Sequence, residues 1–222
     1  ADVLDRGYVL RDESGRGVRM IGAMHDLSQR KAAEQALAES RTWLRKLIDA
    51  ADEGFYAIDE DGRTTLCNAA FLRMLGFDDE QQVIGRRLHY LIHHTHADGT
   101  PYDHRDCPIS RCAVDGTPAH VVGELFHTRD GRAFPVEYRA SPIVIDGHVR
   151  GAICTFVDIT DRLRAESALR ESEARFRNMA DHAPVMMWLT DADGRCTYLN
   201  RQWYRFTGQS GGEGHGLGGL DA

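Results

Sequence analysis

The side chains with the most obvious ligand chemistry are concentrated in one stretch, HHTHADGTPYDHRDCPISRC, which covers residues 93–112. This stretch contains four imidazoles and two thiols, namely His93, His94, His96, His104, Cys107 and Cys112. Imidazole and thiolate are side chains that bind zinc and haem iron. The sequence therefore raises the question of a metal or haem site at this point of the chain.

The spacing of these residues argues against a closed zinc site. Structural zinc takes four ligands, commonly in C-x2–4-C and H-x3–5-H pairs. Cys107 and Cys112 are i and i+5, and on one helix such side chains point about 140° apart. His93 and Cys107 meet only if the chain between them forms an unusual loop. We predict no bound metal and keep five weak ligand candidates: His93, His96, His104, Cys107 and Cys112.

The same stretch also has the features of a solvated connection. Residues 98–101 contain two turn pairs, Asp-Gly and Thr-Pro. A short helix is expected from Pro108, because proline suits the first helical turn, and Asp106 is its expected cap. The apolar stripe of that helix consists of Ile109, Cys112 and Ala113. We therefore interpret residues 93–107 as a polar loop whose histidines titrate with the pH of the solvent.

Composition narrows the classes of function. The chain has 222 residues, a formal net charge of −7 and 42% hydrophobic residues, which suits one or two globular domains. The negative charge and the lack of a basic run argue against nucleic-acid binding. No apolar run is long enough to span a membrane. Five cysteines are an odd number without a regular framework, so we expect reduced thiols and a cytoplasmic location.

An internal repeat organises the sequence. Residues 26–77 align without gaps on residues 158–209, at an offset of 132. Matched identities include Asp26 with Asp158, Glu34 with Glu166, Leu37 with Leu169, Asn68 with Asn200 and Gly76 with Gly208. The repeat predicts one complete unit over 43–160, the end of a preceding unit over 1–28, and the beginning of a further unit over 175–222. Since the chain starts without Met, we expect it to be part of a longer protein.

Hydrophobic periodicity predicts the fold class of the complete unit. Residues 53–68 form a hairpin around Asp61-Gly62, and residues 69–77 have helical spacing that ends at Gly76. Three strand-like runs follow after residue 118, joined by short Asp-Gly turns. We expect an α+β domain with an antiparallel sheet of about five strands, helices on one face, and amphipathic linker helices between units.

The linkers, expected over 29–50 and 161–178, and the few residues after each of them repeat apolar or small residues at 3-4 spacing, which is typical of a coiled-coil seam. The first seam is Ala33, Leu37, Ser40, Leu44, Leu47 and Ala51, and the second is Ala165, Leu169, Ser172, Phe176, Met179 and Ala183. We expect a parallel homodimer through these helices. The alternative is that each helix packs on its own domain.

Three segments carry a resemblance to a known family. CNAAFLRMLGFDDEQQVIGRRL, HTRDGRAFPVEYRASPI and GAICTFVDITDRLRAESALRESEARFR resemble PAS domains with their C-terminal PAC segment. The last copy, APVMMWLTDADGRCTYLNRQWYRFTGQ, resembles PAS units that precede histidine kinase cores. The resemblance implies a sensory module without catalytic residues, placed beside PAS and kinase domains of a parent sensor histidine kinase. A cyclic-dinucleotide cyclase or phosphodiesterase as the output, and a metal- or haem-binding sensor, remain alternatives.

The resemblance also implies roles for individual residues. Asp158 would tie the last strand to the outgoing helix that begins near Thr160, and Asp26 and Ser28 would repeat this link one unit earlier. Plain helix capping by Thr160 or Asp161 is the alternative. Leu88 stands where the flavin-binding photosensors have their reactive cysteine, so we expect no flavin–cysteinyl adduct. His104 and His96 are the nearest candidates for a haem ligand, but no partner residues define a haem pocket.

We predict no cofactor, but a small-molecule pocket between the sheet and the helix at 69–75 is possible. Strand alternation puts Ala152, Cys154 and Phe156 on one face of the last strand. The other candidates for the pocket lining are Tyr56, Ile58, Phe71, Leu75, Leu88, Leu91, Val122 and Tyr138. The alternative is that these side chains are simply the core.

Overall fold

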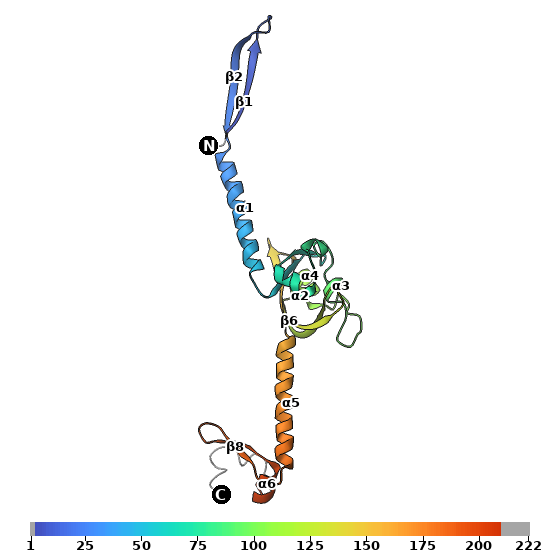
Figure 1. Cartoon of the computed structure of the whole chain (residues 1–222). Coiled ribbons are helices and arrows are strands. Elements are labelled where there is room, and N and C mark those ends of the chain that lie inside the picture. The colour runs from blue at the N-terminus through green and yellow to red at the C-terminus, as the bar shows by residue number, and fades with distance from the viewer. Residues whose placement is uncertain (1–2, 210–222) are drawn as a thin grey trace. The chain divides into compact units, whose positions relative to one another are not determined.

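The computed structural model describes residues 3–209, which form two compact units that meet between Asp158 and Ile159. The first unit contains β1 (Val3–Arg11), β2 (Gly17–Asp26), α1 (Ser28–Asp49), β3 (Gly54–Ile58), β4 (Thr64–Cys67), α2 (Ala69–Leu75), the 3-10 turn η1 (Glu80–Gln82), α3 (His89–Ile92), α4 (Pro108–Asp115), β5 (Ala119–His127), β6 (Ala133–Ile145) and β7 (His148–Asp158). The second unit contains α5 (Thr160–His182), β8 (Trp188–Thr190), β9 (Cys196–Leu199) and α6 (Arg201–Thr207) (Figure 1).

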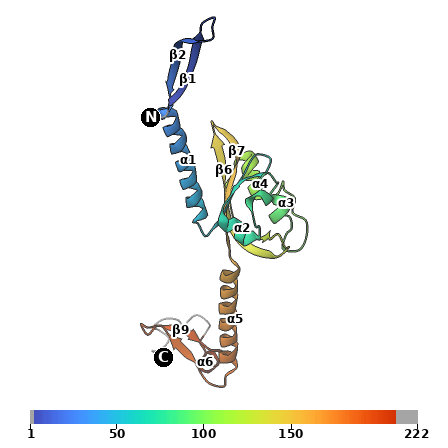
Figure 2. The ribbon, with the colours of Figure 1, turned by 45° about the horizontal axis from the view of Figure 1, so that its top comes forward.

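The centre of the first unit is a five-stranded antiparallel sheet with the strand order β4-β3-β7-β6-β5. The alternating sequence of β6 buries Phe134, Val136, Tyr138 and Ala140 and leaves the residues between them more exposed. Helices α2, α3 and α4 cover this buried face (Figure 2). The predicted α+β class, with about five strands and helices on one face, is confirmed.

Aromatic rings dominate the core between the sheet and the helices. Tyr56, Phe71, Phe126, Tyr138 and Phe156 are each at most 2% exposed, and their ring centroids lie 5.1–6.2 Å apart in the contacting pairs. Burying each such side chain contributes roughly 1.5–3 kcal/mol to folding. These rings hold β3, β7 and α2 together. They thereby fix the position of β3, which is the strand that follows α1.

The linker helices are single continuous helices. Helix α1 matches the expected range closely, whereas α5 continues to His182, four residues beyond the prediction. Leu37, Leu44 and Leu47 are each more than half exposed, as an unpaired coiled-coil seam is. Phe176 differs because its ring packs on Tyr198 of the same unit at a centroid distance of 5.5 Å. The homodimer stays a prediction, and part of the second seam packs within its own unit.

Two expectations about helix ends are wrong. Ile159 occupies the N-cap of α5, so Thr160 is its first residue, and neither Thr160 nor Asp161 is the cap. Cys107 occupies the N-cap of α4, and Pro108 is its first residue, so Asp106 lies outside the helix and makes no capping bond.

Strands β1 and β2 form an isolated antiparallel hairpin whose side chains are exposed on both faces. The assignment of this hairpin to a preceding unit, and the other unit boundaries, stay predictions. Residues 210–222, the end of the expected further unit, lie outside the described residues. Within residues 3–209, no helix has the length and apolar character needed to cross a membrane.

Candidate functional site

A cluster of His89, His93, Cys107 and Glu124, of which His93 and Cys107 are buried, lies between α3, the start of α4 and strand β5. His93 is 2% exposed and Cys107 is 1% exposed. The Cys107 Sγ atom lies 3.3 Å from His93 Nδ1. On the other side of the ring, His93 Nε2 lies 2.9 Å from Glu124 Oε2, an ion-pair distance without good hydrogen-bond alignment. Residues separated by up to 35 positions therefore form one polar site inside the core.

Tyrosine hydroxyls hold the Glu124 carboxylate in place. Tyr138 donates to Oε2 at 2.8 Å and Tyr102 donates to Oε1 at 3.2 Å. Burial raises the pKa of Glu124, but the bonds from His93 and the tyrosines outweigh it and lower that pKa overall. The carboxylate is therefore a fixed negative charge beside His93.

The charges of His93 and Cys107 depend on each other. Burial disfavours a charged ring, but Cys107 and Glu124 outweigh burial and raise the pKa of His93 to about 9. Burial also disfavours a thiolate, but the imidazoles of His89 and His93 outweigh it and lower the pKa of Cys107 to about 6. An imidazolium–thiolate pair is the favoured state at neutral pH.

A small cavity opens next to this pair. Its walls are formed by Tyr56, Ile58, Gly62, Leu88, His89, Ile92, His93, Cys107, Ile109 and Ser110. The space inside admits about one water molecule. In this conformation it is far smaller than the several hundred Å³ that pockets for drug-sized ligands occupy.

Only some of the residues predicted to line a small-molecule pocket lie at the cavity. Tyr56, Ile58 and Leu88 line the cavity. Six others, Phe71, Leu75, Tyr138, Ala152, Cys154 and Phe156, are buried in the surrounding core. Leu91 packs at the edge of the core, and its neighbour Ile92 faces the cavity instead. The assignment of Val122 to the pocket is wrong, because a bulge at Gly123 shifts the register of β5 and leaves Val122 53% exposed.

The description of residues 93–107 as a solvated loop is wrong for its two ends, since His93 and Cys107 are buried and in contact. His89 was missed altogether, although the i, i+4 spacing of His89 and His93 is a signal that places two imidazoles on one helical face. The other metal candidates lie elsewhere. His96 stacks on Tyr102, His104 contacts Tyr90 and Asp103, and Cys112 is buried without joining the cluster.

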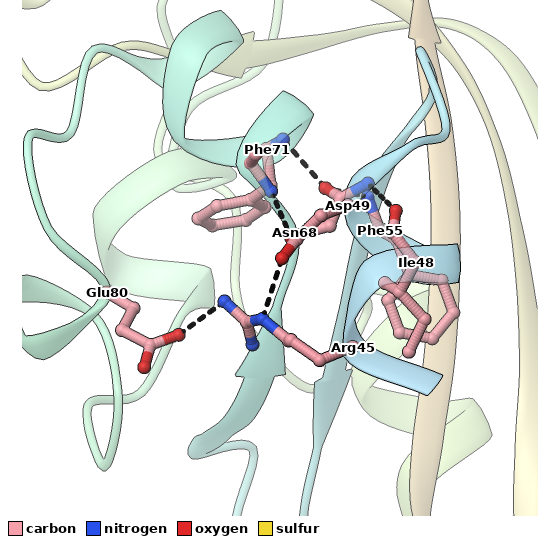
Figure 3. A network of polar contacts seen from close by, with 8 residues as sticks. Arg45, Ile48, Asp49, Phe55, Asn68, Phe71 and Glu80 are labelled. Atoms are coloured by element: carbon pink, nitrogen blue, oxygen red, sulfur yellow. Dashed lines mark hydrogen bonds and ion pairs between the residues drawn. The ribbon is translucent and has the colours of Figure 1, made fainter. Parts of the chain in front are cut away.

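A second polar site joins α1 to the domain (Figure 3). The fully buried Asn68 side chain donates to the carbonyl oxygens of Ile48, in the last turn of α1, and of Glu53, just before β3. Its Oδ1 atom accepts the N–H groups of Phe55 in β3 and Phe71 in α2. The four bonds are 2.8–3.1 Å long and use the full capacity of the amide. We call this arrangement the asparagine clamp.

Charged side chains of α1 extend the clamp. Asp49 Oδ1 accepts the Ala69 N–H at 2.9 Å, at the start of α2. Arg45 donates to Asp49 at 3.0 Å and reaches Glu80 at 2.7 Å. The last turn of α1 is thus bound to α2 and η1 by its own side chains, and Asn68 connects it to β3.

The second unit repeats the clamp at the offset of 132. Asn200 is fully buried and donates to Ala180 and Val185, while its Oδ1 accepts the N–H groups of Met187 and Trp203. In the same unit, Asp181 accepts the Arg201 N–H at 2.8 Å, as Asp49 does for Ala69. The sequence repeat is therefore a repeat of the connection between a linker helix and the domain that follows it.

Comparison with known proteins agrees with this architecture. The sequence profile described as the PAS fold matches residues 43–159, more than half of the chain. The chain belongs to the PAS family. A second profile, described as a PAS domain, matches residues 174–221. The chain therefore contains PAS sensory domains in tandem.

Three relatives of this PAS chain come from bacteria. The "Uncharacterized protein y4lL" of Sinorhizobium fredii is 38% identical over 113 residues, 51% of this chain. The "Probable diguanylate cyclase DgcE" of Escherichia coli is 24% identical over 68% of the chain, and the "Virulence sensor protein BvgS" of Bordetella pertussis is 29% identical over 66%. The matched segments make up 14%, 13% and 12% of those proteins, respectively.

On the entry side of the PAS domain, the Asp26 carboxylate binds the first residue of α1. Its Oδ1 atom accepts the Ser28 N–H at 2.8 Å, one of the N–H groups that a helix start leaves without a partner. Asp158 and Thr160 occupy the corresponding positions between β7 and α5. The coupling role of these four residues stays a prediction.

Removal of the clamp amide should destabilise the first PAS domain strongly. Asn68→Ala removes four hydrogen bonds and leaves the Glu53 carbonyl and the Phe55 and Phe71 N–H groups without their Asn68 partner, so the free energy of unfolding should fall by about 3 kcal/mol. Urea unfolding followed by circular dichroism measures this change. Gln81→Ala, at an exposed position near the clamp, should change stability by less than about 0.5 kcal/mol. Equal effects of the two substitutions would contradict the clamp.

The metal-free protein should contain one thiol that titrates near pH 6. Burial raises the pKa of the Cys67, Cys112 and Cys154 thiols, whereas that of Cys107 is lowered. Ultraviolet thiolate absorbance should therefore rise as pH increases through about 6, and Cys107→Ser should abolish that step. His93→Gln removes the imidazole and should shift the step to higher pH. A step that persists in Cys107→Ser would show that another thiol is responsible.

Proposed function

We propose that this chain is the sensory and signal-transmitting segment of a longer bacterial protein, a sensor histidine kinase of a two-component phosphorelay. The observation that carries the proposal is the asparagine clamp, which joins a linker helix to a PAS domain in the same way twice. The chain itself has the role of a relay, and the catalytic steps belong to domains elsewhere in the parent protein. It acts in the cytoplasm, where its thiols stay reduced.

The clamp gives the relay a physical route. Phe55 bonds to Asn68 through its N–H, and the next residue, Tyr56, lines the cavity beside His93. A ligand that displaces β3 or α2 therefore pulls on the last turn of α1, because separating them breaks buried hydrogen bonds that each cost about 1–3 kcal/mol to leave unmade. A change in the core thus becomes a movement of the helix end.

The linker helices then carry the movement between units. The exposed leucines of α1 pair with those of a second copy in a parallel coiled coil, and rotation of this pair changes the geometry of the domains beyond it. Asp158 at the end of β7 and Thr160 at the start of α5 transmit the movement out of the complete PAS domain, as Asp26 and Ser28 transmit it from the unit before.

A second output is supported by one specific observation. The chain is similar to both the virulence sensor protein BvgS and the probable diguanylate cyclase DgcE. A cyclic-dinucleotide cyclase therefore stands as the alternative output. The resemblance of residues 183–209 to PAS units that precede kinase cores favours the kinase.

The output is tested on the full-length parent protein. Incubation with ATP labelled at the γ-phosphate should label a histidine, and incubation with GTP should yield no cyclic dinucleotide. Formation of cyclic di-GMP without labelling by ATP would overturn the kinase and support the alternative.

The coupling role of Asp158 is tested on the same protein. Asp158→Ala should change the basal output activity about fivefold or more, the lower range of allosteric coupling, while the melting temperature stays within a few degrees of the wild type. Asp161→Ala is the matched control, because that side chain is 99% exposed, and its activity should equal that of the wild type. Unchanged activity of Asp158→Ala, or unfolding of that variant, would leave Asp158 with a structural role only.

A further inference from the structure

The cluster of His89, His93 and Cys107 has the composition and spacing of a metal centre. One ligand atom from each residue lies within 4.8 Å of the other two. Tetrahedral zinc, with Zn–S near 2.3 Å and Zn–N near 2.0–2.1 Å, places sulfur and nitrogen about 3.6 Å apart. The Cys107 Sγ to His93 Nδ1 distance of 3.3 Å is already close to that value. Only the His89 ring has to move, toward Cys107 and His93, for all three ligand atoms to reach one zinc ion.

Both imidazoles present a nitrogen to the centre of the cluster. His89 Nε2 lies 2.8 Å from the backbone oxygen of Tyr102, which can only accept, so Nε2 carries the proton. In the neutral ring the lone pair is therefore on Nδ1, which is buried and has no hydrogen-bond partner of good geometry. An orphaned acceptor in a core is costly, and a cation beside it would remove that cost.

The outer contacts of the rings are those that metal-binding histidines make. Such histidines bind the metal through one nitrogen and contact a carbonyl or carboxylate through the other. His89 contacts the Tyr102 carbonyl, and His93 contacts the Glu124 carboxylate. Tyr102 and Tyr138 fix that carboxylate in turn. Both rings therefore have the carbonyl or carboxylate contact that orients a metal-binding histidine.

We propose that His89, His93 and Cys107 bind one zinc ion, with a water molecule from the adjacent cavity as the fourth ligand. Two imidazoles and one thiolate suit zinc in both charge and softness. Three protein ligands with one open position are characteristic of zinc sites that exchange their fourth ligand. The cavity, which admits about one water molecule, lies against all three residues.

Zinc binding would connect parts of the domain that the chain separates. His89 is the first residue of α3, His93 is the C-cap of that helix, and Cys107 is the N-cap of α4. The ion would close the loop 94–106 and shift the walls of the cavity that Tyr56 shares. This inference concerns the input of the PAS domain, so its success or failure is independent of which output domain the parent carries.

The full 222-residue chain, stripped with a chelator, provides the test. Titration with Zn²⁺ should give one ion per chain by elemental analysis, with a higher melting temperature because the ion binds only the folded state. Titration with Co²⁺ in place of Zn²⁺ should give a thiolate-to-cobalt charge-transfer band and the visible bands of a tetrahedral ion. These spectra report on the wild type directly and do not depend on any variant folding.

Substitutions assign the ligands. Cys107→Ser should abolish the charge-transfer band, and His89→Gln should weaken binding at least tenfold. His96→Gln and Cys112→Ser are matched controls outside the cluster and should bind as the wild type does.

Failure to take up a stoichiometric ion would overturn the proposal, as would uptake that Cys107→Ser and His89→Gln leave unchanged. Reversible oxidation of Cys107 by peroxide in a protein that binds no metal would also overturn it, and would identify the imidazolium–thiolate pair as a redox site instead.

Discussion

The buried amide of Asn68 is the contact on which the connection between helix and domain depends. A side-chain amide can make four hydrogen bonds, and Asn68 makes all four with the backbone of three elements. In the core such bonds are strong and an unmade one is costly, so the end of α1, the start of β3 and the start of α2 are held as one body. The same amide contacts at Asn200 show that this is the way a linker helix enters a PAS domain in this chain.

The clamp and the His–Cys cluster share one strand. Phe55 of β3 is held by the clamp, and Tyr56 and Ile58 of the same strand line the cavity beside His93 and Cys107. The aromatic contacts of Tyr56 with Phe71 and Phe156 carry any displacement into α2 and β7. Close packing allows such a displacement only as a concerted shift. Strand β3 therefore connects the His–Cys cluster directly to the end of α1.

Periodicity and repetition were sufficient to predict the fold, because both can be read directly from the order of residue types in the sequence. Strand alternation in β6 and the seam spacing in α1 are visible without knowledge of any tertiary contact. The cluster was not predictable in the same way, since His93 and Cys107 meet only after the loop between them folds back. The bulge at Gly123 similarly reversed the side of the sheet expected for Val122. Asn68 stood out as a repeated identity, but the sequence alone did not say what its amide binds.

Native-state hydrogen exchange by NMR tests the central claim, which is that the helix end and the domain form one cooperative unit. The amides to follow are those of Phe55, Ala69 and Phe71, which donate to the clamp. The account predicts that all three exchange only with the global unfolding of the sheet, at the same free energy as the amides of β6 and β7. Exchange of these three amides at a markedly lower free energy, while the sheet stays protected, would contradict it.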